Sequence, residues 1–228
     1  MIYAMKRNRF FVLLCLIVTL SSCGPTRFYA GFTPTEVMHG MALLGPLSEQ
    51  YYIDKQNYEA YSDSLSLVSE SLITSYVEEI LPITQRVQLN QIETEEAIAF
   101  MDFITSQKQK MRGEYPIPVA LDDLLELRGE RYGLLICAYG MTRDIKGYAK
   151  DVAKGLLVGI ATAVLTMGAA SMYGIPVNYY SNIYAAILDS ETDRIVFYNL
   201  HGQGAEINPI QPVPVMRQLD SIFRDFLE

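Results

Sequence analysis

Helical periodicity is clearest over residues 62–81 of this chain. Hydrophobic residues recur there at intervals of three and four, which places them on one face of a helix: Leu65, Val68, Leu72, Tyr76 and Ile80. Ser62 offers an oxygen to the free amides of the first turn, and Pro82 ends the segment. We therefore expect an amphipathic helix from Ser62 to Leu81.

Three other segments have helical patterns. Residues 93–111 begin with Thr94 as the candidate N-cap and with acids that suit the positive end of the helix dipole. Residues 120–127 predict a short helix in which three leucines lie together. Residues 214–227 carry an apolar stripe made of Val215, Leu219, Ile222 and Phe226.

Strand patterns separate these helices. Short apolar or alternating runs between turn residues predict strands over residues 40–47, 86–90, 131–140, 182–188 and 194–199. Gly45 and Pro46 would close the first strand, and several tyrosines would follow it in a polar connection: Tyr51, Tyr52, Tyr58 and Tyr61. A sugar- or peptide-binding surface would suit these tyrosines, but a role in covering a small core is favoured. This order of elements predicts an α/β fold, a single mixed-sheet α/β sandwich domain.

The N-terminus carries an export signal. The apolar run Phe10–Leu20 follows a basic start, and its 11 residues are too few for a helix that spans a bilayer. Its end, Leu20-Ser21-Ser22-Cys23, resembles the bacterial lipobox. That resemblance implies diacylglycerol on the Cys23 sulfur and cleavage before Cys23. We expect a signal peptide over 1–22, a lipidated tether over 23–38 and the α/β domain over 39–228.

Charge and cysteine content limit the functions further. The net charge of −8 becomes about −11 once Lys6, Arg7 and Arg9 leave with the signal, so we expect no nucleic-acid partner. Cys137 would then be the single unmodified thiol, and its apolar surroundings predict an inert side chain. No cofactor motif is recognised, and we expect no cofactor.

An apolar segment, residues 155–177, interrupts the domain, and no charge occurs between Lys154 and Asp189. Gly155, Gly159 and Ala163 recur every four residues, as in faces where helices pack closely. Three interpretations stay open: a buried core element, a self-associating or membrane-inserting element, and a permanent transmembrane helix. The third would separate two strands that should share one sheet.

The C-terminal half resembles a group of bacterial envelope lipoproteins. The shared pattern is a strand of small residues with a leucine, then an aspartate, a polar turn and a strand with an aromatic residue. The positions that carry it are Ala185, Ala186, Leu188, Asp189, Thr192, Ile195, Val196 and Phe197. The group includes the curli-secretion channel lipoprotein, penicillin-binding-protein activator lipoproteins and the amino-terminal domain of the Tol propeller protein. Asp193 stands where a turn glycine is common, and Phe197 replaces tryptophan. The resemblance, over residues 130–228, implies an adaptor or assembly role.

Candidate catalytic groups are sparse. His39 and His201 are the two histidines, and His201 could act with Asp189 or Glu206 if the fold joined them. The acids Asp122, Asp123 and Glu126 are typical of a solvated helix face rather than of a metal loop. The glycines of "HGQGAE", residues 201–206, suit a loop rather than a phosphate site, because no helix follows.

We therefore expect a non-catalytic outer-membrane lipoprotein of a Gram-negative cell that faces the periplasm. Sorting to the outer membrane follows from the resemblance, because Gly24 rather than aspartate comes after Cys23. Its partners would be membrane lipid, through acylated Cys23, and envelope proteins. The alternatives are a secretion-pore subunit that forms a homo-oligomer and a hydrolase or ligand-binding enzyme whose site forms only in the fold.

Overall fold

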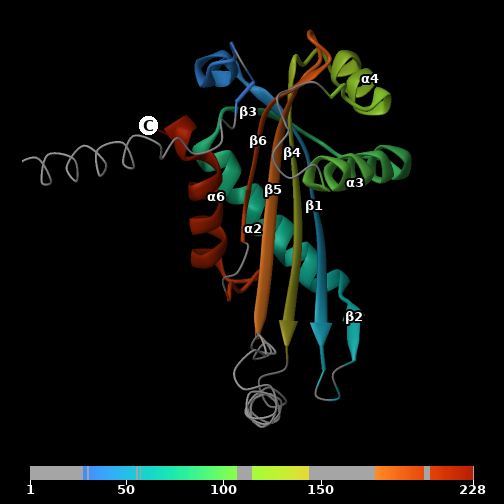
Figure 1. Cartoon of the computed structure of the whole chain (residues 1–228), viewed down its shortest axis with the longest axis vertical. Helices are drawn as coiled ribbons and strands as arrows, with labels where there is room; N and C mark the ends of the chain where they lie inside the picture. The colour runs from blue at the N-terminus through green and yellow to red at the C-terminus, as the bar shows by residue number, and fades with distance from the viewer. Residues whose placement is uncertain are drawn as a thin grey trace, which may run out of the picture.

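The structure, a computed structural model, describes residues 28–29, 31–54, 56, 58–106, 115–143, 178–202 and 206–227. These residues form one six-stranded mixed sheet with helices on both faces, as Figure 1 shows. The predicted α/β architecture with one mixed sheet is therefore confirmed. The strands are β1 (Met41–Ile53), β2 (Glu59–Tyr61), β3 (Ile83–Val87), β4 (Tyr132–Arg143), β5 (Tyr179–Asp189) and β6 (Arg194–His201).

The sheet runs in the order β2-β1-β4-β5-β6, and β3 pairs with the first half of β1. β1 is parallel to β3 and β4, whereas the β1–β2, β4–β5 and β5–β6 pairs are antiparallel. The helices are η1 (Pro34–His39), α2 (Asp63–Ile80), α3 (Gln91–Ser106), α4 (Val119–Arg128) and α6 (Pro212–Leu227).

Two hydrophobic cores lie on opposite faces of the sheet. One packs η1, α2 and α6 against one face, and Phe197 and Phe223 are among its fully buried side chains. The other packs α3 and α4 against the opposite face around Leu121 and Leu125. Burial of these apolar surfaces, at about 25 cal/mol per Å², supplies the main driving force for the fold.

The first strand is longer than predicted. Gly45 and Pro46, joined by a cis peptide bond, do not end β1 but lie at an irregularity where its register with β4 shifts between Leu44 and Leu47. The strand then continues to Ile53. The tyrosines that we placed in a connection mostly lie in strands: Tyr51 and Tyr52 in β1, and Tyr61 in β2.

The helix α2 begins as predicted, but its buried stripe differs. The Ser62 hydroxyl accepts a hydrogen bond from the Leu65 amide at 3.5 Å. The buried positions are Ser66, Ser69, Ile73 and Val77, whereas Val68 is exposed. The buried positions in the first half of α2 are serines because they face the polar half of β1. There, the backbone N–H of Gln50 donates to the Ser66 hydroxyl at 3.0 Å.

Other predicted boundaries also move. Asn90, rather than Thr94, begins α3, since its side chain accepts from the Glu93 amide while the Glu93 carboxylate accepts from the Asn90 amide. The third strand covers Ile83–Val87 instead of residues 86–90, and β4 and β5 extend beyond their predicted ends.

The described residues nearest to the apolar segment, Arg143 and Asn178, lie together at one end of two neighbouring strands. The segment 155–177, with Gly155, Gly159 and Ala163, lies outside the described residues, as does Cys23. β4 and β5 are neighbours, and the Arg143 amide donates to the Asn178 carbonyl at 2.9 Å. The expectation that both flanking strands share one sheet is confirmed. Among the described helices, none combines the length and the hydropathy that a membrane crossing requires.

The N-terminal residues that the structure describes pack on the domain. Phe28 forms an isolated bridge with Phe197 of β6, and the two ring centroids are 5.2 Å apart. Its ring also lies 5.3 Å from that of Phe226 in α6. The chain therefore reaches the domain at Phe28, beside β6 and α6.

Candidate functional site

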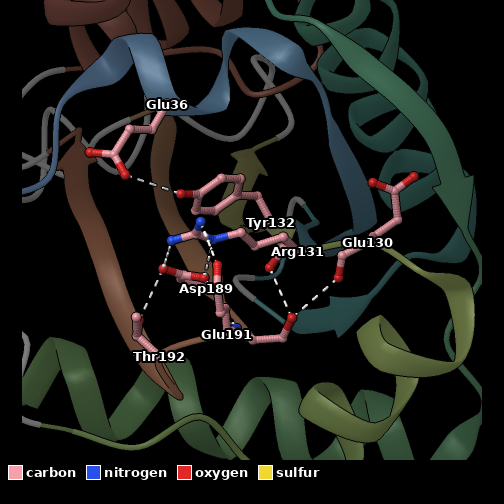
Figure 2. A network of polar contacts seen from close by, with 8 residues as sticks. Glu36, Glu130, Arg131, Tyr132, Asp189, Glu191 and Thr192 are labelled. Atoms are coloured by element: carbon pink, nitrogen blue, oxygen red, sulfur yellow. Dashed lines mark hydrogen bonds and ion pairs between the residues drawn. The ribbon is translucent and has the colours of Figure 1, made fainter.

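An ion pair joins the start of β4 to the end of β5. Arg131 donates from Nε and Nη2 to the two carboxylate oxygens of Asp189, at 2.8 and 3.0 Å. Asp189 also accepts from the Thr192 hydroxyl at 3.0 Å and the Glu191 amide at 3.2 Å. Figure 2 shows the guanidinium beside this carboxylate, with Thr192 on its other side. The aspartate of the resemblance pattern thus holds the β5–β6 turn.

The surrounding polar groups are paired with one another. The guanidinium carbon of Arg131 lies 4.8 Å from the centroid of the Tyr132 ring, and the Tyr132 hydroxyl donates to Glu36 at 3.3 Å. Burial, followed by the charge of Asp189, raises the pKa of Tyr132 to about 12. Glu130 accepts from Thr84 and Gln85. Four of these residues, Glu36, Glu130, Arg131 and Tyr132, line an open cleft of about 610 Å³. Because their polar groups bond to neighbouring residues, they indicate a structural role for this network.

The fold does not bring His201 and Asp189 together. Asp189 lies opposite Arg194 at one end of β6, and His201 lies opposite Ile183 at the other end. The condition under which His201 could act with Asp189 is therefore not met, because both belong to an extended hairpin that keeps its ends apart. Glu206 accepts a hydrogen bond from the Asn178 amide at 2.8 Å. Across the described parts of the chain, no group of three His, Cys, Asp or Glu side chains could hold a metal ion.

Two other candidate features have structural explanations. Gly202 has φ +140°, and a Cβ there would lie 2.0 Å from the Ser181 carbonyl oxygen, so the position requires glycine for close packing. Burial raises the pKa of the Cys137 thiol to about 12, with smaller contributions from Asp102 and Glu49. Cys137 is thus inert as a nucleophile at neutral pH.

The main candidate for a functional surface is a row of four tyrosines, Tyr61, Tyr51, Tyr139 and Tyr180, which we call the tyrosine ladder. They come from β2, β1, β4 and β5, which are consecutive strands of the sheet. Adjacent ring centroids are 6.0, 5.5 and 6.1 Å apart. The ladder therefore crosses four strands as one continuous aromatic surface.

The ladder lies on a part of the sheet that none of the described helices covers. In Figure 1, α3 and α4 lie over the upper part of one face, and β1, β4 and β5 run on below α3. Tyr61 remains 52% exposed and Tyr139 remains 39% exposed, although both belong to a sheet. A set of large aromatic side chains exposed together is typical of an interaction surface.

Polar and acidic groups complete this surface. The Asn182 amide donates to the hydroxyls of Tyr180 and Tyr184, which holds the β5 tyrosines in place. Burial raises the pKa of Tyr51 and Tyr139, and the charges of Glu49 and Glu59 raise them further. The ladder therefore lies in a region of negative potential.

Sequence analysis singled out Tyr51 and Tyr61 within a tyrosine cluster but favoured a role in covering a small core over a binding surface. It missed Tyr139 and Tyr180, because they come from β4 and β5, which are distant in sequence. The pairing of Tyr51 with Tyr61 across a short hairpin cannot be seen without the register of β1 and β2.

Comparison with known proteins adds no relative: no protein-family model matches the chain, and no curated protein matches it.

Proposed function

We propose that this protein is a lipid-anchored component of the Gram-negative outer membrane that acts by binding other envelope proteins. The tyrosine ladder is the observation that carries this proposal. Tyrosine is enriched in the cores of protein interfaces, because its ring buries a large area and its hydroxyl keeps a polar contact. In a domain that binds no partner, burying these aromatic rings within the fold would add to its stability.

The lipobox resemblance of Leu20–Cys23 supports the anchor. Phe28 follows Cys23 by five positions, an interval of chain that can span at most about 18 Å. An acylated Cys23 would therefore hold the β6–α6 side of the domain close to the membrane. Tyr180 lies seven residues along β5 from Ile187, the partner of Phe197, which corresponds to about 23 Å. The ladder is thus well separated from the attachment point.

The resemblance of residues 130–228 to envelope-assembly lipoproteins supports an adaptor role in place of catalysis. The positions of that resemblance form the β5–β6 hairpin, whose turn is held by Asp189. The hairpin joins the attachment side of the sheet to the strand that carries Tyr180. We infer that the domain is a rigid support that presents the ladder to a partner.

Site-specific photocrosslinking in living cells tests this function. A benzophenone amino acid would replace Tyr61 or Tyr139, and the control would replace Leu127, which is 83% exposed on α4. We expect discrete adducts with another envelope protein from the ladder positions, weakened by Cys23→Ser, and none from position 127. The same adducts from all three positions would contradict the proposal. Adducts with a second copy of this chain would favour the pore-subunit alternative instead.

A further inference from the structure

A hollow of about 180 Å³ lies beside the tyrosine ladder, between α3 and the sheet. Its buried and half-buried lining is largely apolar and includes Leu47, Met101 and Cys137. Its exposed members are Glu49, Asp102 and Tyr139. The hollow therefore combines an apolar interior with two carboxylates and an aromatic ring at its exposed side. It is smaller than the roughly 300–1,000 Å³ of sites for drug-sized ligands.

The electrostatics of the hollow are negative. Burial raises the pKa of the Cys137 thiol in this hollow, and the charges of Asp102 and Glu49 raise it further. Among the described residues, Arg143 is the cation that follows on β4, and it lies opposite Ile53, four residues along β1 from Glu49, or about 13 Å. That distance exceeds the Debye length of about 8 Å at physiological ionic strength, so this described cation offsets little of the charge of Glu49.

We propose that this hollow binds a lysine or arginine side chain of a protein partner, while neighbouring residues of that partner lie across the tyrosine ladder. This inference rests on the proposed function and adds the chemistry of the partner. The methylene stem of a basic side chain can lie along the apolar lining while its cationic head stays at the exposed side, beside the carboxylates of Glu49 and Asp102. The ring of Tyr139 adds a cation–π contact.

Charge complementarity favours a basic partner over a second copy of this chain. The protein carries a net charge of −8, and the same face of a second copy would bring Glu49, Glu59 and Asp102 against like charges. A bilayer surface presents no lysine or arginine side chain to the hollow. A basic, extended protein segment could place a cationic side chain in the hollow and its neighbouring residues on the tyrosine ladder.

Methyl NMR of the full-length protein in neutral detergent tests this inference, because Met101 lines the hollow. The probe is the peptide acetyl-Gly-Arg-Gly-Arg-Gly-amide, and the matched peptide contains citrulline, which keeps the shape of arginine without its charge. We expect the arginine peptide to shift the Met101 methyl signal and the citrulline peptide to leave it unchanged. Raised salt should weaken the effect.

Paired charge variants separate the hollow from general attraction to an acidic protein. Glu49→Gln with Asp102→Asn should weaken binding about tenfold, as expected for the loss of charge-assisted contacts. Glu79→Gln with Asp123→Asn removes the same charge from exposed sites elsewhere and should change binding less than about twofold. Tyr139→Ala should also weaken binding.

Equal weakening by the two pairs of charge variants, or equal binding of the citrulline peptide, would overturn the inference. A Met101 shift caused equally by phosphatidylcholine vesicles would indicate a membrane surface and would also overturn it. If the arginine peptide fails while the photocrosslinks from Tyr139 appear, only the basic chemistry of the partner is rejected. If both fail, the docking function itself is rejected.

Discussion

Arg131 and Asp189 form a two-point ion pair that joins β4 to the β5–β6 turn. The Asp189 carboxylate is 3% exposed and accepts four hydrogen bonds, whereas the Arg131 side chain is 43% exposed. Glu191 also pairs with Arg131, but from a side chain that is 66% exposed. The same guanidinium thus has one buried and one solvated partner, whose contributions to stability can be compared directly.

Asp189→Ala should lower the free energy of unfolding by about 3 kcal/mol, because it leaves Arg131, Thr192 and the Glu191 amide without their shared acceptor. Glu191→Ala should cost about 0.5 kcal/mol, since an exposed ion pair contributes little. Urea denaturation of both variants measures the difference. Similar losses of free energy of unfolding for the two variants would show that the buried Asp189 stabilises the β5–β6 turn no more than the exposed Glu191 does.

Glu70 of α2 hydrogen-bonds to β1 where neither β2 nor β3 pairs with that strand. We expect its titration to make the free energy of unfolding depend on pH. Its carboxylate accepts from the Ser48 amide at 3.2 Å, in the interval of β1 between its pairings with β3 and β2. Burial raises the pKa of Glu70 above its ordinary value of 4.5, and the Ser48 amide opposes part of that rise. The folded protein therefore holds this proton more tightly than the unfolded chain.

Because of this difference, ionisation of Glu70 lowers the free energy of unfolding as pH rises from 4.5 to the raised native pKa. Glu70→Gln removes this titration, so its free energy of unfolding relative to the wild type should increase across that interval and stay level above it. Denaturation curves from pH 4 to 7 measure this, and Glu79→Gln on the same helix controls for the loss of one charge. A relative stability that falls with pH would contradict the assignment.

The amphipathic helices and the α/β class follow from sequence because hydrophobic periodicity and capping residues act locally. Ser62 caps α2 in the structure as its position predicts. The continuation of β1 could not be predicted, because Gly45 and Pro46 usually mark an ending and the residues after them are polar. Those residues pair with serines of α2, so burial of Gln50 depends on partners 16 and 19 positions away.

The tyrosine ladder is harder still to predict from the sequence, because its members meet only in the folded sheet. Tyr51 and Tyr139 are 88 positions apart in sequence, yet their rings are 5.5 Å apart because β1 and β4 are parallel neighbours. Asp189 and His201 lie far apart for the converse reason. Twelve positions apart looks close in sequence, but a β-hairpin extends that interval along its length.

Cys137 should resist alkylation in the folded protein. With a thiol pKa of about 12, only about one thiol in ten thousand is ionised at pH 8, against roughly a quarter at an ordinary value near 8.5. Iodoacetamide should therefore react on the order of a thousandfold more slowly with the native than with the urea-unfolded protein. Mass spectrometry of the peptide that contains Cys137 follows the reaction. Equal rates in the two states would show that the thiol is accessible and activated.

Cys23→Ser should abolish lipid attachment and processing at this position, since the lipobox resemblance places the thioether on the Cys23 sulfur. Metabolic labelling with a palmitate analogue, followed by membrane fractionation, measures both. The wild type should be labelled and recovered chiefly with the outer membrane. A Cys23→Ser protein that labels as strongly as the wild type would reject the anchor, and recovery in the inner membrane would reject the sorting.

Hydroxyl-radical labelling in isolated envelopes tests the central claim, that the tyrosine ladder is covered by a partner, most directly. The purified protein and the protein in its native membrane would be labelled in parallel and compared at Tyr61, Tyr139 and the exposed control Leu127. The proposal predicts that labelling of both tyrosines falls severalfold in the envelope while labelling of Leu127 stays the same. Equal labelling of Tyr61 and Tyr139 in the two preparations would contradict it.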